Sequence, residues 1–170
     1  MPPELPEGLD PAEIDRFVEA AIAEDLGRGD LTSEAVIPAG TRFSGVLAAR
    51  EDVVLAGLPL AQAVFAKFSS EITWRTLAAD GDVAPKGAAL AEVAGPAVKL
   101  LAAERTAINI VQHLSGIATL TRAYVDAIQG TGAILLDTRK TIPGLRRLAK
   151  YATRIGGATN HRMGLDDGVL

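Results

Sequence analysis

Two basic clusters near the end of the chain have the clearest potential for chemistry. The first is Thr138-Arg139-Lys140-Thr141, which combines two adjacent cations with two hydroxyls, and the second is Asn160-His161-Arg162. Arginine binds carboxylates and phosphates as a bidentate fork, and lysine acts on them as a point charge. These residue types therefore predict a site for an anion that carries carboxylate or phosphate groups.

The elements expected around the two clusters would bring them to one place. Residues 133–136 form an apolar run typical of a strand buried in a parallel sheet, and Pro143 is expected to open a helix that Gly156 and Gly157 close. Such a βα unit places both clusters where strands end, which is where active sites form in parallel α/β folds. Alternatively, Arg139 and Lys140 could lie on an exposed loop without a ligand. The presence of two cationic clusters in register at the ends of successive strands favours an anion-binding site.

The charge of the chain is distributed unevenly. The net charge is −4, but residues 1–34 hold ten acidic residues against Arg16 and Arg28, whereas residues 137–162 hold seven basic residues against Asp137 alone. The basic segment predicts an anionic partner, and a solvated helix face is the alternative. We do not expect this partner to be a nucleic acid, because aromatic residues make up only 4% of the chain and no binding module is present.

Length and composition limit the remaining classes. The chain has 170 residues, 48% of them hydrophobic, and no Cys, which excludes disulfides, thiolate metal sites and a cysteine nucleophile. Neither a Gly-x-Ser-x-Gly elbow nor a zinc-binding His pair is present. No apolar stretch reaches the roughly eighteen residues of a membrane span, and no secretory signal begins the chain, so we expect a cytoplasmic protein without a membrane partner.

Residues 1–115 have the pattern of an α+β domain. Helices are expected at 11–26 and 58–68, short strands within 41–57, 71–77 and 88–93, and a long helix at 97–129. The strands predict compact, sandwich-like antiparallel structure. Their rhythm is similar to that of biotinyl carrier domains, although no modifiable Lys stands near Gly95. We place a domain boundary near residue 115, with an α/β domain over 116–170, and interpret the acidic turn at 24–33 as turn and cap chemistry rather than a metal site.

Arg105 and His113 are further candidates within the long helix. Arg105 is expected at a helix start, where its positive charge opposes the helix dipole. A pair with Glu104 is the simple explanation, and a functional role is the alternative. His113 is interpreted as a hydrogen-bonded core residue.

Three strings in this order resemble the quinolinate phosphoribosyltransferase family. They are E-R-T-A-I-N at 104–109 with S-G-I-A-T at 115–119, D-T-R-K-T at 137–141 with P-G-L-R at 143–146, and G-G at 156–157 with N-H-R at 160–162. The resemblance extends over nearly the whole chain. It implies an N-terminal α+β domain followed by the start of an α/β barrel of the TIM-like, type II phosphoribosyltransferase kind.

The resemblance also implies a reaction. The phosphoribosyl group of phosphoribosyl pyrophosphate (PRPP) would be transferred to the nitrogen of quinolinate, with loss of carbon dioxide and pyrophosphate, to give nicotinate mononucleotide for NAD biosynthesis. Mg²⁺ would accompany PRPP, with no metal ligand in this chain. Both substrates are polyanions, and a site that holds them together needs several fixed cations.

Site roles follow from the resemblance position by position. Arg139, His161 and Arg162 would hold the quinolinate carboxylates, Lys140 would lie between the two substrates, and Thr138 would contribute to the same loop. Arg105 would enter the site of a neighbouring subunit, which implies at least a homodimer. Lys140 and Arg105 are the expected catalytic residues.

The chain departs from the family pattern in two places. A further glycine is usual at the position of Ala158, where a positive φ would strain alanine, and the later Lys, acidic residues and phosphate loops are absent. We therefore expect 170 residues to hold only the first part of the barrel, to expose an apolar sheet edge and to be inactive alone. The alternatives are a relative that uses nicotinate, a homologue linked to molybdate transport, and a non-catalytic carrier module with a biotinyl-like fold.

Overall fold

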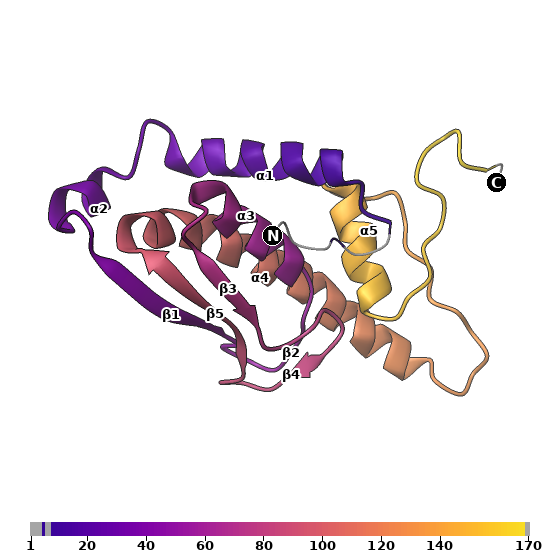
Figure 1. Ribbon diagram of the computed structural model, residues 1–170. Coiled ribbons are helices and arrows are strands. Elements are labelled where there is room, and N and C mark those ends of the chain that lie inside the picture. Colours follow the sequence, from indigo (N-terminus) through magenta and orange to yellow (C-terminus); the bar gives the residue numbers. More distant parts are fainter. Residues whose placement is uncertain (1–4, 6–7, 169–170) are drawn as a thin grey trace.

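The structure is a computed structural model in which residue 5 and residues 8–168 are described. Its elements in chain order are α1 (Pro11–Leu26), α2 (Leu31–Val36), β1 (Arg42–Ala48), β2 (Val53–Val54), α3 (Leu58–Phe68), β3 (Thr73–Thr76), β4 (Val83–Ala84), β5 (Ala89–Pro96), α4 (Ala97–Ala127) and α5 (Arg146–Ile155). Figure 1 shows α4 running along the length of the molecule behind the strands, with α1 and α5 beside it. The three long helices expected before residue 130 are confirmed, as is the antiparallel β-structure between them.

The strands form two small antiparallel sheets. One sheet has the order β1-β5-β3, and the other pairs β2 with β4. On β3, Trp74 lies opposite Val93 of β5 and contacts Phe65 of α3, with ring centroids 5.6 Å apart. Aromatic contact of this kind joins α3 to the sheet.

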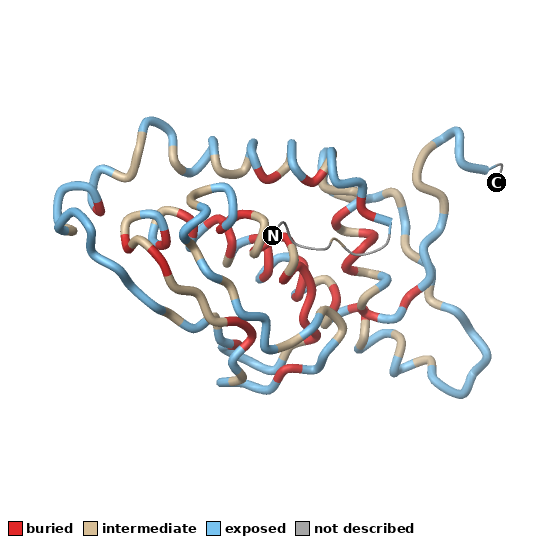
Figure 2. The backbone as a smooth tube through the Cα atoms, viewed as in Figure 1, coloured by how far each residue is buried: buried red, intermediate tan, exposed pale blue. Residues whose placement is uncertain are grey.

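One hydrophobic core extends along α4. It includes Val18 of α1, Val64 of α3 and Leu148 of α5, and Figure 2 shows buried positions repeated along α4. The expected boundary near residue 115 falls inside this unbroken helix, where the Ser115 hydroxyl accepts a hydrogen bond from the backbone N–H of Ala56 at 3.0 Å. Among the described residues, no helix has both the length and the apolar character needed to cross a bilayer.

The strand expected at residues 133–136 does not form. Leu136 makes only an isolated parallel bridge to Thr159, and the side chain of Ile134 is 73% exposed. A parallel strand is stable when neighbouring strands pair with it and helices cover both faces, and a single bridge supplies neither. Ile134 and Leu136 are therefore exposed on a loop, and the apolar sheet edge expected at these residues is not present because no strand forms there.

The helix expected to open at Pro143 begins at Arg146. Residues 142–145 form a turn in which the backbone N of Leu145 donates to the carbonyl of Ile142 at 3.1 Å. Gly144 has a φ of +83°, which helical backbone does not allow, so the helix cannot include it.

The alanine that replaces a family glycine is not strained. Among the described residues only glycines have a positive φ, and Ala158 is buried at 6% exposure. The preceding Gly157 supplies the left-handed backbone, with a φ of +103°.

Candidate functional site

The two basic clusters meet at the carboxylate of Asp137. The parallel bridge between Leu136 and Thr159 places the residues that follow each of them side by side. Asp137 Oδ1 accepts a hydrogen bond from the backbone N of His161, and Oδ2 accepts one from Nδ2 of Asn160, both at 2.7 Å. The structure thus contains the expected juxtaposition, although only one bridge forms in place of two strands.

Lys150 of α5 completes the surroundings of this carboxylate. Its Nζ forms an ion pair with Asp137 Oδ1, and the exposed fractions of the two side chains are 2% for Lys150 and 5% for Asp137. The charge of Lys150 is therefore neutralised within the protein. Arg147 is also paired, with Glu13 at 2.7 Å, so the cations of the basic segment are not equally available to a ligand.

The loop after Asp137 keeps unused hydrogen-bonding capacity. Arg139 Nε and Thr141 Oγ1 are buried and have no hydrogen-bond partner among the described residues. The backbone N of Lys140 donates to Thr138 Oγ1 at 3.1 Å, so Thr138 helps to fix the turn, and the Lys140 side chain is exposed. Because an unpaired buried donor is costly, the guanidinium of Arg139 is suited to an anion that supplies an acceptor.

The position of His161 defines its protonation pattern. Its Nδ1 accepts a hydrogen bond from the backbone N of Arg162 at 2.7 Å. A ring nitrogen that accepts carries no proton, so the neutral imidazole has its proton on Nε2 and can donate from that side. Arg162 is oriented by a bond from Nη1 to the carbonyl of Gly168 at 3.2 Å.

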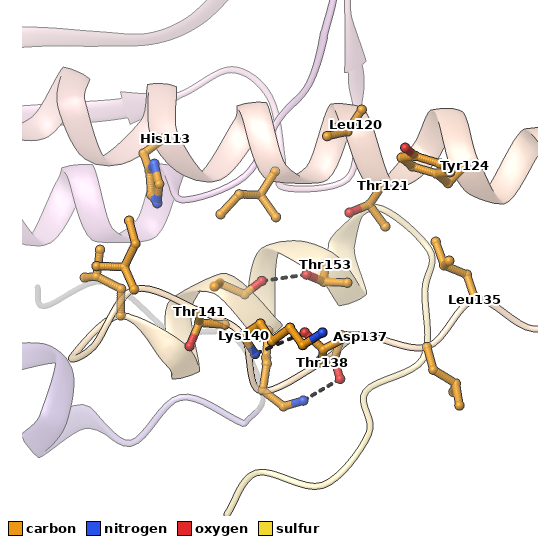
Figure 3. A pocket seen from close by; sticks show the side chains of 16 residues that line it. His113, Leu120, Thr121, Tyr124, Leu135, Asp137, Thr138, Lys140, Thr141 and Thr153 are labelled. Carbon is orange, nitrogen blue, oxygen red and sulfur yellow. Dashed lines mark hydrogen bonds and ion pairs between the residues drawn. The ribbon is translucent and has the colours of Figure 1, made fainter.

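A cavity of about 400 Å³ lies between α4 and this loop. Figure 3 shows Thr138, Lys140 and Thr141 on the loop side, with His113 and Tyr124 on the α4 side and His113 directed toward the loop. The lining combines hydroxyls, Lys140 and the Asp137–Lys150 ion pair with an apolar wall, and apolar walls with a few polar groups are usual for small-ligand sites.

The expectation that His113 belongs to the core is wrong. The residue is exposed, whereas Ile110 and Leu114 on either side of it are buried. Those two side chains occupy the core face of α4, and His113 lies at the margin of that face, where it contributes to the cavity wall.

Arg105 lies in the third turn of α4 and not at a helix start, so the argument from the helix dipole does not apply. It is exposed and forms no ion pair with Glu104 or any other described residue. Arg105 is absent from the lining of the cavity, as are Arg139, His161 and Arg162. Its neighbour Thr106 lines a separate cavity together with Leu145 and Leu148 at the start of α5.

The acidic turn at 24–33 has a structural explanation. Asp30 caps α2 by accepting from the backbone N of Ser33 at 3.0 Å. Hydrogen bonds from the Ser33 side chain and then from its backbone lower the pKa of Asp30. Asp25 accepts from the hydroxyl of Thr106 at 3.4 Å. Within the described part of the chain, no group of three or more His, Asp or Glu residues is arranged to hold a metal ion.

Sequence reasoning assigns no role to either Asp137 or Lys150. Asp137 enters it only through the D-T-R-K-T string and the net charge, and Lys150 only through the net charge. The available signal for Asp137 is an acidic residue placed directly after an apolar run and before two cations. No local signal identifies Lys150 as its partner, because the pairing depends on how α5 packs.

Family comparison gives two adjoining matches. Residues 30–115 match the N-terminal domain of quinolinate phosphoribosyl transferase, and residues 117–170 match the C-terminal domain of the same family.

Individual relatives agree with these matches. The chain is 44% identical to a probable nicotinate-nucleotide pyrophosphorylase [carboxylating] of Synechocystis, over 92% of this chain and 53% of the relative. It is 47% identical to a nicotinate-nucleotide pyrophosphorylase [carboxylating] of Mycobacterium leprae, over 90% and 55%. A crystal structure of NadC from Streptococcus pyogenes superposes with a TM-score of 0.90 at 41% identity, over 95% of this chain and 58% of the other. The chain thus spans about half the length of the curated relatives it matches.

Proposed function

Because the chain belongs to the quinolinate phosphoribosyltransferase family, we propose that it serves phosphoribosyl transfer from PRPP to quinolinate. The products would be nicotinate mononucleotide, carbon dioxide and pyrophosphate, in de novo NAD biosynthesis. The observation that carries this proposal is the Asp137 carboxylate, which ties the loop of Arg139 and Lys140 to that of His161 and Arg162.

The proposed site matches the chemistry of a dicarboxylate. Quinolinate has two adjacent carboxylates, and Arg139 and Arg162 offer guanidinium forks on loops held side by side. His161 adds a donor at Nε2. Charge-assisted bonds of this kind are stronger than neutral ones and set the orientation of the ring.

The chemical step proposed for this site is a dissociative displacement at the ribose. The pyrophosphate leaves with its bonding electron pair while positive charge develops on the ribose, and the lone pair of the quinolinate nitrogen forms the new bond. That lone pair needs no general base, so the site needs cations rather than an acid–base pair. Lys140 is proposed to lie between the substrates, where its charge favours both anions. Carbon dioxide is then lost from the carboxyl group beside the ring nitrogen: the bonding pair stays on the ring carbon, which takes up a proton from water.

Magnesium enters this proposal as the ion that accompanies PRPP. Within the described residues no group of three or more His, Asp or Glu side chains is arranged to hold a metal ion, and no step proposed here depends on one. When bound to PRPP, Mg²⁺ would neutralise charge on the leaving pyrophosphate.

A homodimer is part of the proposal. Arg105 is exposed and forms no ion pair within the described residues. We assign it to the site of the neighbouring subunit, where it would add a cation toward the substrates. The cytoplasm is the proposed location.

Substitution of Arg139 and Arg162 tests the proposed function. Arg139→Ala and Arg162→Ala in the intact protein should each weaken quinolinate binding by about 1.5–3 kcal/mol, roughly tenfold to a hundredfold in KM. The matched control is Arg75→Ala, which removes an exposed arginine paired with Glu92 on the sheet. Unchanged KM and kcat in both site variants would contradict the proposal.

Substrate choice tests the alternatives. Carbon dioxide release with quinolinate, and none with nicotinate, distinguishes the proposed reaction from that of a nicotinate-using relative. A carrier module would show an attached prosthetic group by mass spectrometry.

A further inference from the structure

We propose that Asp137 and Lys150 are a positioning pair. The pair holds the loop of Arg139 and the loop of Arg162, the two ligand-binding loops, in the geometry that binds a dicarboxylate. The inference rests on the proposed function of the loops and assigns roles to two residues that do not themselves bind substrate. Three donors from two segments converge on the Asp137 carboxylate: Nζ of Lys150 in α5, Nδ2 of Asn160 and the backbone N of His161.

Burial shows that this pair is not an ordinary surface ion pair. The side chains of Lys150 and Asp137 are 2% and 5% exposed. A buried pair of charges loses its hydration, and replacing it with apolar residues of similar volume is often neutral or stabilising. Folding stability alone therefore does not explain why charges occupy these two positions.

Connectivity shows what the pair holds. Asp137 directly precedes Thr138, Arg139 and Lys140, and its carboxylate binds the backbone of His161, so displacement of this carboxylate moves both loops. Asn160 adds a second tie, because its Nδ2 also donates to the backbone carbonyl of Lys150 at 2.9 Å. α5 and the two loops are thus fixed to one another around a single anionic group.

A direct role for Lys150 in binding anions is disfavoured. Lys150 is among the residues that line the 400 Å³ cavity, but its charge is already paired with Asp137 and its side chain is almost fully enclosed. The neighbouring Lys140 is exposed and forms no ion pair with a described residue. Lys140 is therefore the cation available to a ligand, and Lys150 is the cation that fixes the loops.

An apolar replacement of the pair separates positioning from folding. Asp137→Leu combined with Lys150→Met keeps similar volumes and removes both charges, together with every hydrogen bond to the carboxylate. We expect a urea midpoint close to that of the wild type, and a dissociation constant for quinolinate, measured by calorimetry without PRPP, raised at least about tenfold. Lys67→Met is the matched control, since Lys67 pairs with Glu19 at 2.9 Å on the surface, and its quinolinate affinity should be unchanged.

Native stability together with native quinolinate affinity in the apolar variant would overturn the proposal. If the apolar variant does not fold, Asp137→Asn provides the test. The dissociation constant for quinolinate is then measured for Asp137→Asn in the wild-type background and in an Arg139→Ala background. A positioning role predicts a clearly smaller loss of affinity in that background, because Arg139 is one of the groups being positioned. An equal loss in both backgrounds would refute the role.

The Arg139→Ala variant also separates the two proposals. If Arg139→Ala itself leaves quinolinate affinity unchanged, the proposed function fails. If it weakens binding while both Asp137 variants bind as the wild type does, only the positioning role fails.

Discussion

The hydroxyl of Tyr151 connects α5 to the N-terminal part of the chain through Asp80. The Asp80 carboxylate accepts this hydroxyl and the backbone N–H groups of Gly57 at 2.6 Å and Leu58 at 3.0 Å, so it caps α3 from a distant position in the sequence. Tyr151→Phe would leave the carboxylate one donor short. We expect urea unfolding to show a loss of about 1.5–3 kcal/mol, with Tyr124→Phe, an exposed tyrosine, as the control.

The contribution of the Tyr151–Asp80 hydrogen bond to the free energy of unfolding depends on pH. Burial and the charge of Asp80 raise the pKa of Tyr151 above its usual value. A raised pKa in the folded state gives stability that is fully present below the unfolded pKa of about 10 and is lost as the pH rises above it. The difference in unfolding free energy between wild type and Tyr151→Phe should therefore shrink between about pH 9 and 11, and a constant difference would contradict the assignment.

Single residues of the site differ in how far local sequence predicts them. The local sequence is enough to predict Arg139, Lys140 and Arg162, because a cation next to an expected strand end indicates an anion-binding site without knowledge of its partners. Asp137 and Lys150 are not, because their pairing arises only when α5 packs against the loop. Helical spacing predicts a core position for His113, because spacing cannot distinguish the centre of a buried face from its margin.

At the scale of elements, the end of α5 lies directly on the backbone of α4. A Cβ at Gly156 would lie 2.6 Å from the carbonyl oxygen of Ala118 and 2.6 Å from Cβ of Thr121. Gly156→Ala should force the helices apart and cost about 1–3 kcal/mol of unfolding free energy. The control is Gly116→Ala in α4, whose Cβ would meet nothing within 4 Å and should stabilise the helix by about 0.5–1 kcal/mol. Equal urea midpoints for the two variants would rule out this close packing.

Elements with a local cause were predicted well, and elements that depend on a partner were not. α1 begins and ends where expected, because Asp10 caps it, Pro11 suits its first turn and Gly27 ends it. The strand at 133–136 depends on neighbouring strands, which an apolar run does not reveal. The start of α5 depends on the turn at Gly144, since Pro143 suits either a turn or a first helical position.

Over the whole molecule, the ion pairs define which charges act on a ligand. Lys150 and Arg147 are neutralised by Asp137 and Glu13, so the attraction for polyanions depends chiefly on the arginines and lysine of the two loops. Salt screens exposed charges, with a Debye length of about 10 Å at 0.1 M. The KM for quinolinate should rise severalfold between about 50 and 500 mM NaCl, and Arg162→Ala should flatten this dependence. A KM independent of salt would contradict electrostatic attraction.

The proposed assembly makes the strongest prediction about the molecule as a whole. If Arg105 completes the neighbouring site, each site takes Arg162 from one subunit and Arg105 from the other. In the intact protein, a heterodimer of Arg105→Ala with Arg162→Ala then has one intact site and one doubly defective site, and should recover about half of the wild-type activity. The two subunits can be co-expressed with different tags and purified through both. The control heterodimer combines Arg139→Ala with Arg162→Ala, which belong to the same side of the site, and should stay inactive because neither of its sites is intact. If the heterodimer of Arg105→Ala with Arg162→Ala is as inactive as this control, Arg105 acts within its own subunit.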